Sequence, residues 1–287
     1  MSTNPETSNT PNWQASAPAI DYMSDEFARV YELTGTRVTA PIAVEALRLM
    51  EPIPFHSRIL DIGAGAGALS IPAAYGGAGV LAVDIAPGMV NLLSDRLAPF
   101  PFASARVMNG EDLRLPDNSF DLTFSILGIS LFRDWKKGLS EMNRVLRPGG
   151  KACLASWKTP PGGGPFMVMA KALRTIFPDS PPPPASEGFQ TLADPARVVT
   201  AMQIAGFTDV KVVEFETIWK GYGGRPYLDA MQELHTYMAP YAALNEADRG
   251  KVDDAILAII EGYTVDGIVE IPSPVLLAIA SKASQQT

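Results

Sequence analysis

Short apolar segments alternate with amphipathic segments over most of this chain of 287 residues. The apolar segments have the length of strands, and the stretches between them are long enough for helices. Strands that are separated by helices pair in parallel, because a helical crossover returns the chain to the same edge of the sheet. The nearly continuous apolarity of GVLAVD and KACLASW favours strands that are buried on both faces. The pattern therefore predicts an α/β fold whose mostly parallel sheet carries helices on both faces.

The alternation gives these strands and helices defined positions. The predicted strands cover residues 58–62, 79–84, 105–108, 120–125, 151–157 and 210–217. The predicted helices between them cover residues 66–74, 87–97, 135–146 and 194–205. Two more helical patterns precede the first strand, over residues 24–35 and 40–50. Ser24 is a suitable N-cap for the first of them, because its side chain can accept a hydrogen bond from a free N–H of the first turn.

The chain also divides into a core and additions to it. The first residues are rich in Ser, Thr, Asn and Pro, which predicts a disordered or loosely docked tail. Two helical inserts interrupt the alternation, and we expect them either to cap a substrate site or to complete the core. The predicted parts are a tail (1–20) and one domain (21–287) that contains a helical lid (21–50), a core (51–158) and the inserts (159–190 and 225–263).

Composition excludes several classes of protein. The net charge is −8 and the longest basic run is the pair Lys136–Lys137, so the clustered cations that bind a nucleic-acid backbone are missing. Cys153 is the single cysteine and cannot form an internal disulfide. The chain has only two histidines, His56 and His235, so no metal site is expected. Neither a signal peptide nor an apolar run of membrane-spanning length is visible. The sequence therefore predicts a cytoplasmic protein with no nucleic-acid or membrane partner, and it leaves the oligomeric state open.

One loop predicts a ligand-binding site. The stretch LDIGAGAG reads as a strand that ends near Asp61, followed by the alternating glycines Gly63, Gly65 and Gly67. Glycine has no Cβ, so such a loop lets the backbone approach a ligand closely. Asp84 ends the next strand, at the spacing of an acidic residue that accepts hydrogen bonds from ribose hydroxyls. Because both features also suit a dinucleotide, the loop alone does not decide between NAD and S-adenosylmethionine.

Motifs further along the chain favour the second of these ligands. The segments MNGEDLRLPDNSFDLTFSILGISLF and EMNRVLRPGGKACLASW follow the glycine loop in order. Together with the loop they resemble the class I S-adenosylmethionine-dependent methyltransferases, most closely the subgroup that includes the quinone-biosynthesis methyltransferases. The resemblance covers residues 58–157 and continues loosely through AGFTDVKVVEF. It implies a Rossmann-like, seven-stranded, mostly parallel sheet that ends in an antiparallel strand, with residues 271–283 as that strand and 208–219 as its partner.

The resemblance implies a cofactor site built at the ends of four strands. Residues after the first strand would hold the amino-acid end of S-adenosylmethionine, and those after the second would bind its ribose and pack on its adenine. Residues after the third strand would contact the adenine edge, and those after the fourth would approach the sulfonium and its methyl group. In chain order the implied residues are Asp61, Gly63, Ala64, Gly65, Asp84, Ile85, Asn109, Gly110, Glu111, Ser125 and Ile126.

The chemistry of these residues agrees with that cofactor. Asp61 can pair with its ammonium group, while the N–H groups of the loop and the N-terminus of the following helix favour its carboxylate. The family usually has an acidic residue where this chain has Asn109. This departure leaves open whether Asn109 or Glu111 makes the hydrogen bond to adenine.

The acceptor side of the site offers fewer candidates, and the catalytic residue is unknown. The family often shows histidines after its fourth strand, where this chain has GISLF. Trp157 follows the fifth strand and is expected to be either a substrate wall or a packing residue. His235 is either a substrate contact or a residue at the edge of the core. Tyr22 and Tyr31, together with Phe27, form either a lid across the cofactor or ordinary core packing.

Methyl transfer to a small or medium, hydrophobic small molecule is the expected reaction, with S-adenosylhomocysteine as the product. The Met- and Pro-rich inserts favour a hydrophobic acceptor, and we prefer oxygen as the methylated atom. Positioning of the reactants can supply roughly 7–11 kcal/mol, more than the roughly 3–5 kcal/mol of a general base, so a missing base does not exclude catalysis. Two alternatives stay open. One is an NAD(P)-dependent oxidoreductase, although no tyrosine here precedes a lysine by four positions. The other is a non-catalytic homologue that binds the cofactor for regulation.

Overall fold

The computed structural model describes residues 19–159, 162–182 and 185–284, so the predicted tail lies almost wholly outside the described residues. The chain divides into two compact units. The sheet unit consists of Asp21–Gly164, Ala185–Lys220 and the C-terminal segment from Ile271. The helical unit contains Pro165–Pro184 and Gly221–Glu270, which fall within or close to the two predicted inserts.

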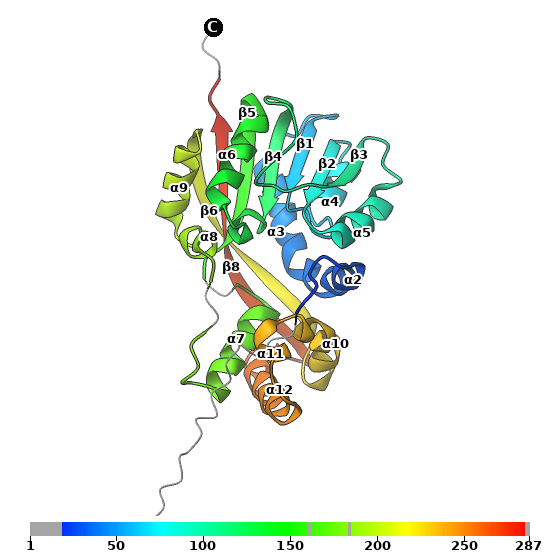
Figure 1. Cartoon of the computed structure of the whole chain (residues 1–287), viewed down its shortest axis with the longest axis vertical. Coiled ribbons are helices and arrows are strands. Elements are labelled where there is room, and N and C mark those ends of the chain that lie inside the picture. Colours follow the sequence, from blue (N-terminus) through cyan, green and yellow to red (C-terminus); the bar gives the residue numbers. More distant parts are fainter. Residues whose placement is uncertain (1–18, 160–161, 183–184, 285–287) are drawn as a thin grey trace, which may run out of the picture. The chain divides into compact units, whose positions relative to one another are not determined.

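The strands form one mixed sheet of eight strands, in the order β3-β2-β1-β4-β5-β8-β6, with β7 paired to β8 (Figure 1). The pairs from β3 to β5 are all parallel, and β8 is antiparallel to β5 with Trp157 opposite Val275. This confirms the predicted mostly parallel sheet with an antiparallel last strand. The strands are β1 (Arg58–Ile62), β2 (Gly79–Asp84), β3 (Ala103–Val107), β4 (Phe120–Ile126), β5 (Leu146–Trp157), β6 (Phe207–Tyr222), β7 (Thr264–Val265) and β8 (Ile268–Lys282).

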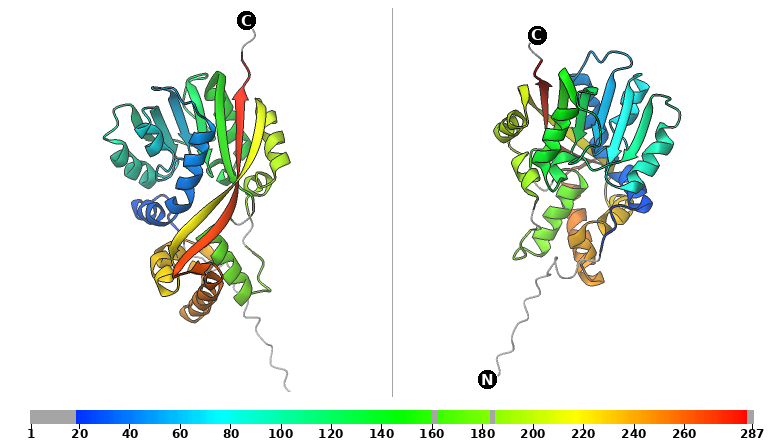
Figure 2. Two further views of the ribbon diagram at one scale, coloured as in Figure 1. Left: turned by 180° about the vertical axis from the view of Figure 1, so that it is seen from behind. Right: turned by 45° about the horizontal axis from the view of Figure 1, so that its top comes forward.

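Helices cover both faces of the parallel part of the sheet. Helix α3 lies on one face and helix α6 on the other, and both contact β4 and β5 (Figures 1 and 2). Helix α2 packs on α5 and on α3. The helices of this unit are α2 (Asp25–Thr34), α3 (Thr36–Leu49), α4 (Ser70–Tyr75), α5 (Pro87–Leu97), α6 (Trp135–Val145), α8 (Glu187–Thr191) and α9 (Pro195–Ile204), with a short 3-10 turn, η1 (Ile129–Leu131).

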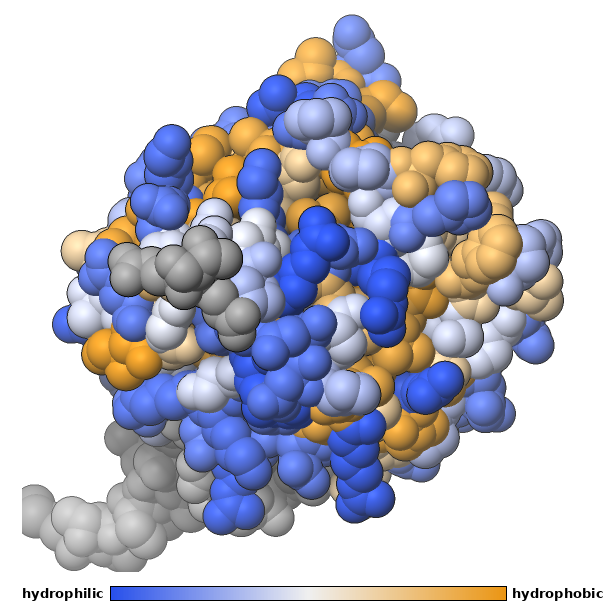
Figure 3. Space-filling model, turned by 90° about the horizontal axis from the view of Figure 1, so that it is seen from above, coloured by the Kyte–Doolittle hydropathy of each residue, from blue (hydrophilic) through white to orange (hydrophobic). Residues whose placement is uncertain are grey.

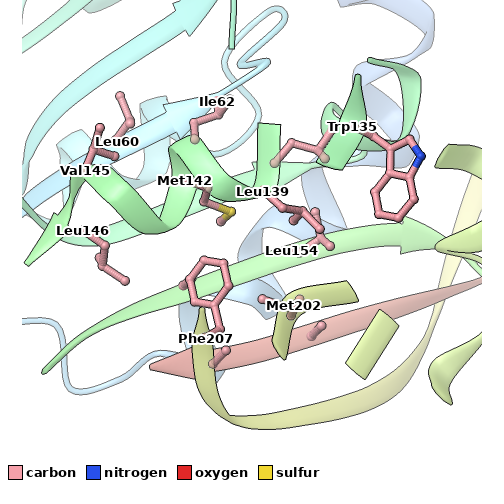
Figure 4. Packing of buried hydrophobic residues seen from close by; sticks show 14 of the residues in the cluster. Leu60, Ile62, Trp135, Leu139, Met142, Val145, Leu146, Leu154, Met202 and Phe207 are labelled. Atoms are coloured by element: carbon pink, nitrogen blue, oxygen red, sulfur yellow. The ribbon is translucent and has the colours of Figure 1, made fainter. Parts of the chain in front are cut away.

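The core of the sheet unit lies between α6 and the strands (Figure 4). One side of α6 is apolar at helical spacing, and its side chains are buried. A side chain of this size gains roughly 1.5–3 kcal/mol on full burial, so this face fixes how α6 lies on the sheet. The buried side chains labelled in Figure 4 are Leu60, Ile62, Trp135, Leu139, Met142, Val145, Leu146, Leu154, Met202 and Phe207.

The helical unit has its own packing. Helix α7 lies against α12, and Lys171 of α7 donates a hydrogen bond to the hydroxyl of Tyr263 over 2.7 Å. Asn245 caps α12 by accepting the N–H of Asp248 at 2.9 Å. The helices of this unit are α7 (Pro165–Ile176), α10 (Arg225–Thr236), α11 (Ala239–Ala242) and α12 (Glu246–Glu261).

The surface of the described chain gives no sign of a membrane-spanning segment. Among the residues that the structure describes, no helix combines the length and the apolarity needed to cross a bilayer. The face shown in Figure 3 mixes hydrophilic and hydrophobic residues. Scattered apolar residues of this kind are normal on a protein surface and require no partner.

Candidate functional site

The glycine loop lies where the strand order of the sheet reverses. Strands β2 and β3 lie on one side of β1, and β4 and β5 lie on the other. In open α/β sheets such a reversal opens a crevice at the carboxyl ends of the strands. The loops after β1 and β4 approach each other closely here, because a Cβ added to Gly63 would lie 3.1 Å from the Cα of Gly128. Gly63 also has a φ of 69°, so only glycine fits this position without strain.

The N–H groups at the start of the loop are engaged inside the protein. Those of Gly63 and Ala64 donate to the carbonyl oxygen of Val83 at 2.9 and 3.0 Å, and that of Gly65 donates to Oδ2 of Asp84 at 2.8 Å. This differs from the prediction that these groups face the cofactor's carboxylate. The reason is the adjacent parallel strand β2, in which the carbonyl oxygen of Val83 and the carboxylate of Asp84 accept these hydrogen bonds.

The helix after the loop begins later than predicted. Residues 66–69 form turns, and α4 starts only at Ser70 and has six residues. Gly67 has a φ of 91°, which no right-handed helix accommodates. The N-terminus of α4 is therefore not at the glycines, and the prediction that it favours the cofactor's carboxylate has no support from this geometry.

Asp61 is the buried acidic group of the site. Its side chain is 1% exposed, and its Oδ2 accepts a hydrogen bond from the Ser70 hydroxyl at 2.6 Å. Burial raises the pKa of the Asp61 carboxyl to about 7, the hydrogen bond from Ser70 opposes the shift, and the nearby Asp84 carboxylate adds to it. A cation placed beside Asp61 would reverse this penalty.

Asp84 is held in one orientation by the backbone on both of its sides. Oδ2 accepts the N–H of Gly65, and Oδ1 accepts the N–H of Ala86 at 2.9 Å. Burial raises the pKa of Asp84, and these hydrogen bonds oppose the shift. Each carboxylate oxygen retains a lone pair for a further donor such as a hydroxyl. Ile85 follows directly and is 54% exposed, as an apolar surface for a flat ring would be.

A hollow of about 310 Å³, counted with its solvent-open part, lies beside the loop. Six of the predicted site residues line it, namely Tyr31, Asp61, Gly63, Ala64, Gly65 and Ile126. The remaining lining residues were not predicted from the sequence, and they are Thr39, Ala66, Ala68 and Leu69.

The residues after β3 differ in how freely they can reach a ligand. Glu111 is partly buried, and its Oε1 accepts the N–H of Asp134 at the start of α6 over 3.0 Å. Asn109 is exposed and uses its Oδ1 to accept the N–H of Glu111 at 2.9 Å. Gly110 is buried, and a Cβ there would lie 2.5 Å from the ring of Phe132. One carboxylate oxygen of Glu111 is thus engaged by α6, and the amide oxygen of Asn109 is engaged by the backbone of Glu111.

The last two residues of β4 place one predicted side chain in the hollow and one outside it. Ile126 lines the hollow. Ser125 is fully buried, and its hydroxyl accepts the N–H of Ile129 at 3.1 Å, which stabilises the turn. Leu127 follows with a φ of 64°, a strained value for a branched side chain and of the kind that collects at functional sites.

Aromatic residues of α2 reach the same region. Tyr31 lines the hollow, with its ring beside Gly65. Burial, and after it the Asp84 carboxylate, raises the pKa of the Tyr31 hydroxyl to about 12. Phe27 packs between Tyr31 and Tyr22, with ring centroids 5.9 and 5.2 Å apart. Tyr22 itself is 41% exposed, so of the two predicted tyrosines only Tyr31 lies in the hollow.

Trp157 belongs to a different part of the sheet unit. It ends β5, and a Cβ on Gly163 would lie 2.6 Å from its ring. Gly164 also donates its N–H to the Ser273 hydroxyl at 2.8 Å, which holds this glycine turn against β8. The residues that line the hollow do not include Trp157, and its ring packs against the turn.

His235 lies in the helical unit, within α10. It is 1% exposed, its ring centroid lies 5.4 Å from that of Tyr241, and its Nε2 has no hydrogen-bond partner among the described residues. Burial lowers the pKa of His235 to about 4. The structure thus holds this histidine neutral.

The neutral state of His235 predicts loss of stability in acid. The unfolded chain binds this proton with a pKa near 6.5 and the folded chain near 4, so stability falls as the pH drops from about 7 to 4, by about 3 kcal/mol for this group. In His235→Gln this part of the pH dependence is expected to disappear. Urea unfolding between pH 4 and 7 measures it, and His56→Gln, at the surface, is the matched control. An unchanged acid limb in His235→Gln would show that another group titrates.

Thr39 is the only polar side chain among the residues of the hollow that the sequence analysis did not predict. It lies on α3 among the buried residues Val38, Ile42, Ala43 and Ala46. A polar residue within an apolar helical stripe was the available signal. The other missed residues, Ala66, Ala68 and Leu69, belong to the glycine loop and its continuation.

Known proteins resemble this chain in sequence or in fold. Residues 60–154 match a family model described as a methyltransferase domain. A solved phosphoethanolamine N-methyltransferase 2 of Haemonchus contortus, in complex with phosphomonomethylethanolamine and S-adenosylhomocysteine, superposes with a TM-score of 0.54 at 20% identity. The superposition covers 85% of this chain and 53% of that one, and it shows a common fold.

Two curated relatives are closer in sequence. The chain is 31% identical to nocamycin O-methyltransferase of Saccharothrix syringae over 202 residues. This match covers 65% of this chain and 71% of that relative. The chain is also 33% identical to demethylmenaquinone methyltransferase of Clavibacter sepedonicus over 146 residues. This match covers 50% of this chain and 59% of that relative. The chain therefore belongs to the class I S-adenosylmethionine-dependent methyltransferase family.

Proposed function

We propose that the protein transfers a methyl group from S-adenosylmethionine to a small or medium, hydrophobic small molecule, with an oxygen atom as the preferred acceptor. The sulfonium of the cofactor supplies an activated methyl group. The chain's own residues bind the cofactor and hold the acceptor in line with it. Positioning of this kind can contribute roughly 7–11 kcal/mol to catalysis.

The acidity of the glycine loop supports this cofactor over a dinucleotide. A pyrophosphate needs free N–H donors at the loop, but those of Gly63, Ala64 and Gly65 are engaged. It would also meet the buried carboxylate of Asp61. S-adenosylmethionine carries no phosphate, and its ammonium group would favour the ionised form of the buried Asp61 carboxyl, whose pKa burial raises.

In this proposal, residues of the hollow and residues at or after the ends of β2 and β3 bind different parts of the cofactor. Asp61 pairs with the ammonium, and Asp84 accepts hydrogen bonds from the ribose hydroxyls. Ile85 and Asn109 contact the adenine, and Ile126 lies toward the methyl group. Gly63 and its neighbours in the loop contribute close approach of the backbone, because their N–H groups point elsewhere.

Binding measurements with an Asp84→Ala variant test the cofactor. Calorimetric titration with S-adenosylmethionine, S-adenosylhomocysteine and NAD⁺ is expected to show micromolar binding of the first two alone. Asp84→Ala is expected to weaken that binding roughly 10- to 100-fold, because hydrogen bonds to a charged acceptor are lost. Asp95→Ala, on the exposed side of α5, is the matched control. Binding of NAD⁺ instead would support the oxidoreductase alternative.

The acceptor requires a separate assay. The names of the two relatives fit an O-methyl or a quinone-like acceptor. A panel of hydrophobic phenols, acids and quinols is expected to give methylated products, seen by mass spectrometry. Product formed only from polar amines would contradict the proposed acceptor class. Cofactor binding without turnover over the panel would support the non-catalytic alternative.

Other predictions from the sequence stay predictions. These are the cap formed by the two inserts, the substrate roles of Trp157, His235 and Tyr22, and the cytoplasmic location.

A further inference from the structure

We propose that the hydroxyl of Thr39 donates a hydrogen bond to the carboxylate of the bound S-adenosylmethionine, which makes helix α3 part of the cofactor site. The inference rests on the proposed function. It assigns to the helices before β1 a task that the glycine loop performs in the sequence-based prediction.

The first step is that most N–H groups of the glycine motif already donate within the protein. A carboxylate in a partly buried site needs hydrogen-bond donors or a cation. The N–H groups of Gly63 and Ala64 donate to Val83, and that of Gly65 donates to Asp84. The N–H of Gly67 donates to the carbonyl of Ala64 at 3.0 Å. Four N–H groups of the loop are therefore occupied within the protein, and among the described residues those of Ala66 and Ala68 are not engaged. A hydroxyl in the hollow would add to these two donors.

The second step is the side chains that remain. Of the ten residues that line the hollow, only Tyr31 and Thr39 carry a hydroxyl, and the only charged side chain is Asp61. The ring of Tyr31 lies beside Gly65, whose N–H donates to Asp84, at the end of the hollow that we assign to the ribose. Thr39 is thus the side-chain donor left for the amino-acid end, where Asp61 pairs with the ammonium.

The third step is the state of Thr39 itself. Its side chain is 7% exposed, and its Oγ1 lies 3.5 Å from the carbonyl oxygen of Thr36, at the outer limit of a hydrogen bond. A buried hydroxyl with so weak a partner is unfavourable unless a better acceptor is present. Helix α3 packs on β4 and β5, so the position of Thr39 relative to Ile126 is fixed by the core.

A pair of ligands separates this role from simple packing. Thr39→Val removes the hydroxyl and nearly keeps the shape, and Thr39→Ser keeps the hydroxyl. Decarboxylated S-adenosylmethionine lacks only the carboxylate. In calorimetric titrations we expect Thr39→Val to weaken binding of S-adenosylmethionine about tenfold or more and to change binding of the decarboxylated ligand less than twofold. Thr39→Ser is expected to bind both ligands like the wild type.

Thr123→Val is the matched control. Thr123 is fully buried in β4, and its hydroxyl has no hydrogen-bond partner among the described residues, but it does not line the hollow. Equal losses for both ligands in Thr39→Val, or no loss for either, would overturn the inference. If the wild type binds neither ligand, the proposed function and this inference are both overturned. If the wild type binds S-adenosylmethionine but Thr39→Val binds it equally well, only the inference is overturned.

Discussion

The Asp61→Asn variant is expected to lose S-adenosylmethionine binding by roughly 10²–10³-fold and yet to be more stable than the wild type at pH 8. The loss follows from removing one partner of a buried ion pair. The gain follows from removing a charge that the cofactor-free protein buries at a cost, since Asp61 is 1% exposed and its neighbour Asp84 is also acidic.

The pH dependence of this effect has a defined sign. The Asp61 carboxyl titrates near pH 4 in the unfolded chain and near 7 in the folded chain. The folded protein therefore holds more protons between these values, and the wild type loses stability as the pH rises from about 4 to 7. The loss is on the order of 2–4 kcal/mol at pH 8. Asparagine does not titrate, so the advantage of the variant shrinks toward pH 5.

Thermal melts without cofactor at pH 5 and pH 8 measure the stability, and calorimetric titrations at both values measure binding. For the wild type, affinity is expected to rise up to tenfold per pH unit between pH 5 and 7, because the ammonium binds the ionised carboxyl. Ser70→Ala removes the hydrogen bond to Oδ2 but keeps the charge, and a loss of about tenfold or less is expected. Wild-type affinity in Asp61→Asn would show that Asp61 does not meet the ammonium.

The Gly88→Ala variant is expected to lose stability, although Gly88 does not line the hollow. A Cβ at this position would overlap the carbonyl group of Ser24 and lie 2.6 Å from the backbone nitrogen of Asp25. Backbone atoms cannot turn aside as a flexible side chain does, so the start of α2 must move away from α5. Overpacking of this kind costs about 2 kcal/mol, or about 4–8 °C in Tm.

This displacement is expected to weaken cofactor binding at a distance. Helix α2 carries Tyr31 into the hollow. Its neighbour Glu32 meets Arg96 of α5 at 3.3 Å, and Arg96 also donates to the carbonyl of Ala66 in the glycine loop at 2.8 Å. Moving α2 disturbs both the tyrosine and this bridge. We expect about a tenfold loss of affinity for S-adenosylhomocysteine.

Gly250→Ala is the matched control, with an effect of opposite sign. Gly250 lies on α12, is exposed, and has open space around an added Cβ. Alanine there is expected to stabilise the protein by about 0.5–1 kcal/mol and to leave binding unchanged. Melting curves and calorimetric titrations of both variants provide the comparison. If Gly88→Ala melts and binds like the wild type, α2 does not depend on this contact.

The local sequence pattern correctly predicted the strands that are buried on both faces and the helix that has a clear start residue. The strands 58–62 and 79–84 and the helix 87–97 have the predicted bounds. Apolar runs of strand length define the first two, and Pro87 starts the helix. The strand predicted at 210–217 is longer in the structure, Phe207–Tyr222. Gly206 and Gly223 flank the observed strand directly, so the sequence offered end signals that the predicted range did not use.

The sequence likewise predicted some features of the candidate site and missed others. The sequence predicted that Asp61, Gly63 and Asp84 lie together, because the carboxyl ends of parallel strands share one edge of the sheet. It did not predict that the N–H groups of Gly63 and Gly65 are consumed by the neighbouring strand and by Asp84. It likewise placed Ser125 near the methyl group, whereas the hydroxyl of Ser125 stabilises the turn at Ile129. Such pairings depend on which acceptor lies nearest in space.

The sequence by itself therefore determined the class of the fold, the order of its elements and the family, because these depend on periodicity and on motifs that are local in the chain. Only the tertiary structure decided which donors are free, which carboxylates are buried, and that α3 brings Thr39 to the hollow. Thr39 and Asp61 are 22 positions apart, and no local signal links them. Their meeting in the hollow follows from the burial of α3 against the sheet, which is a property of the whole core.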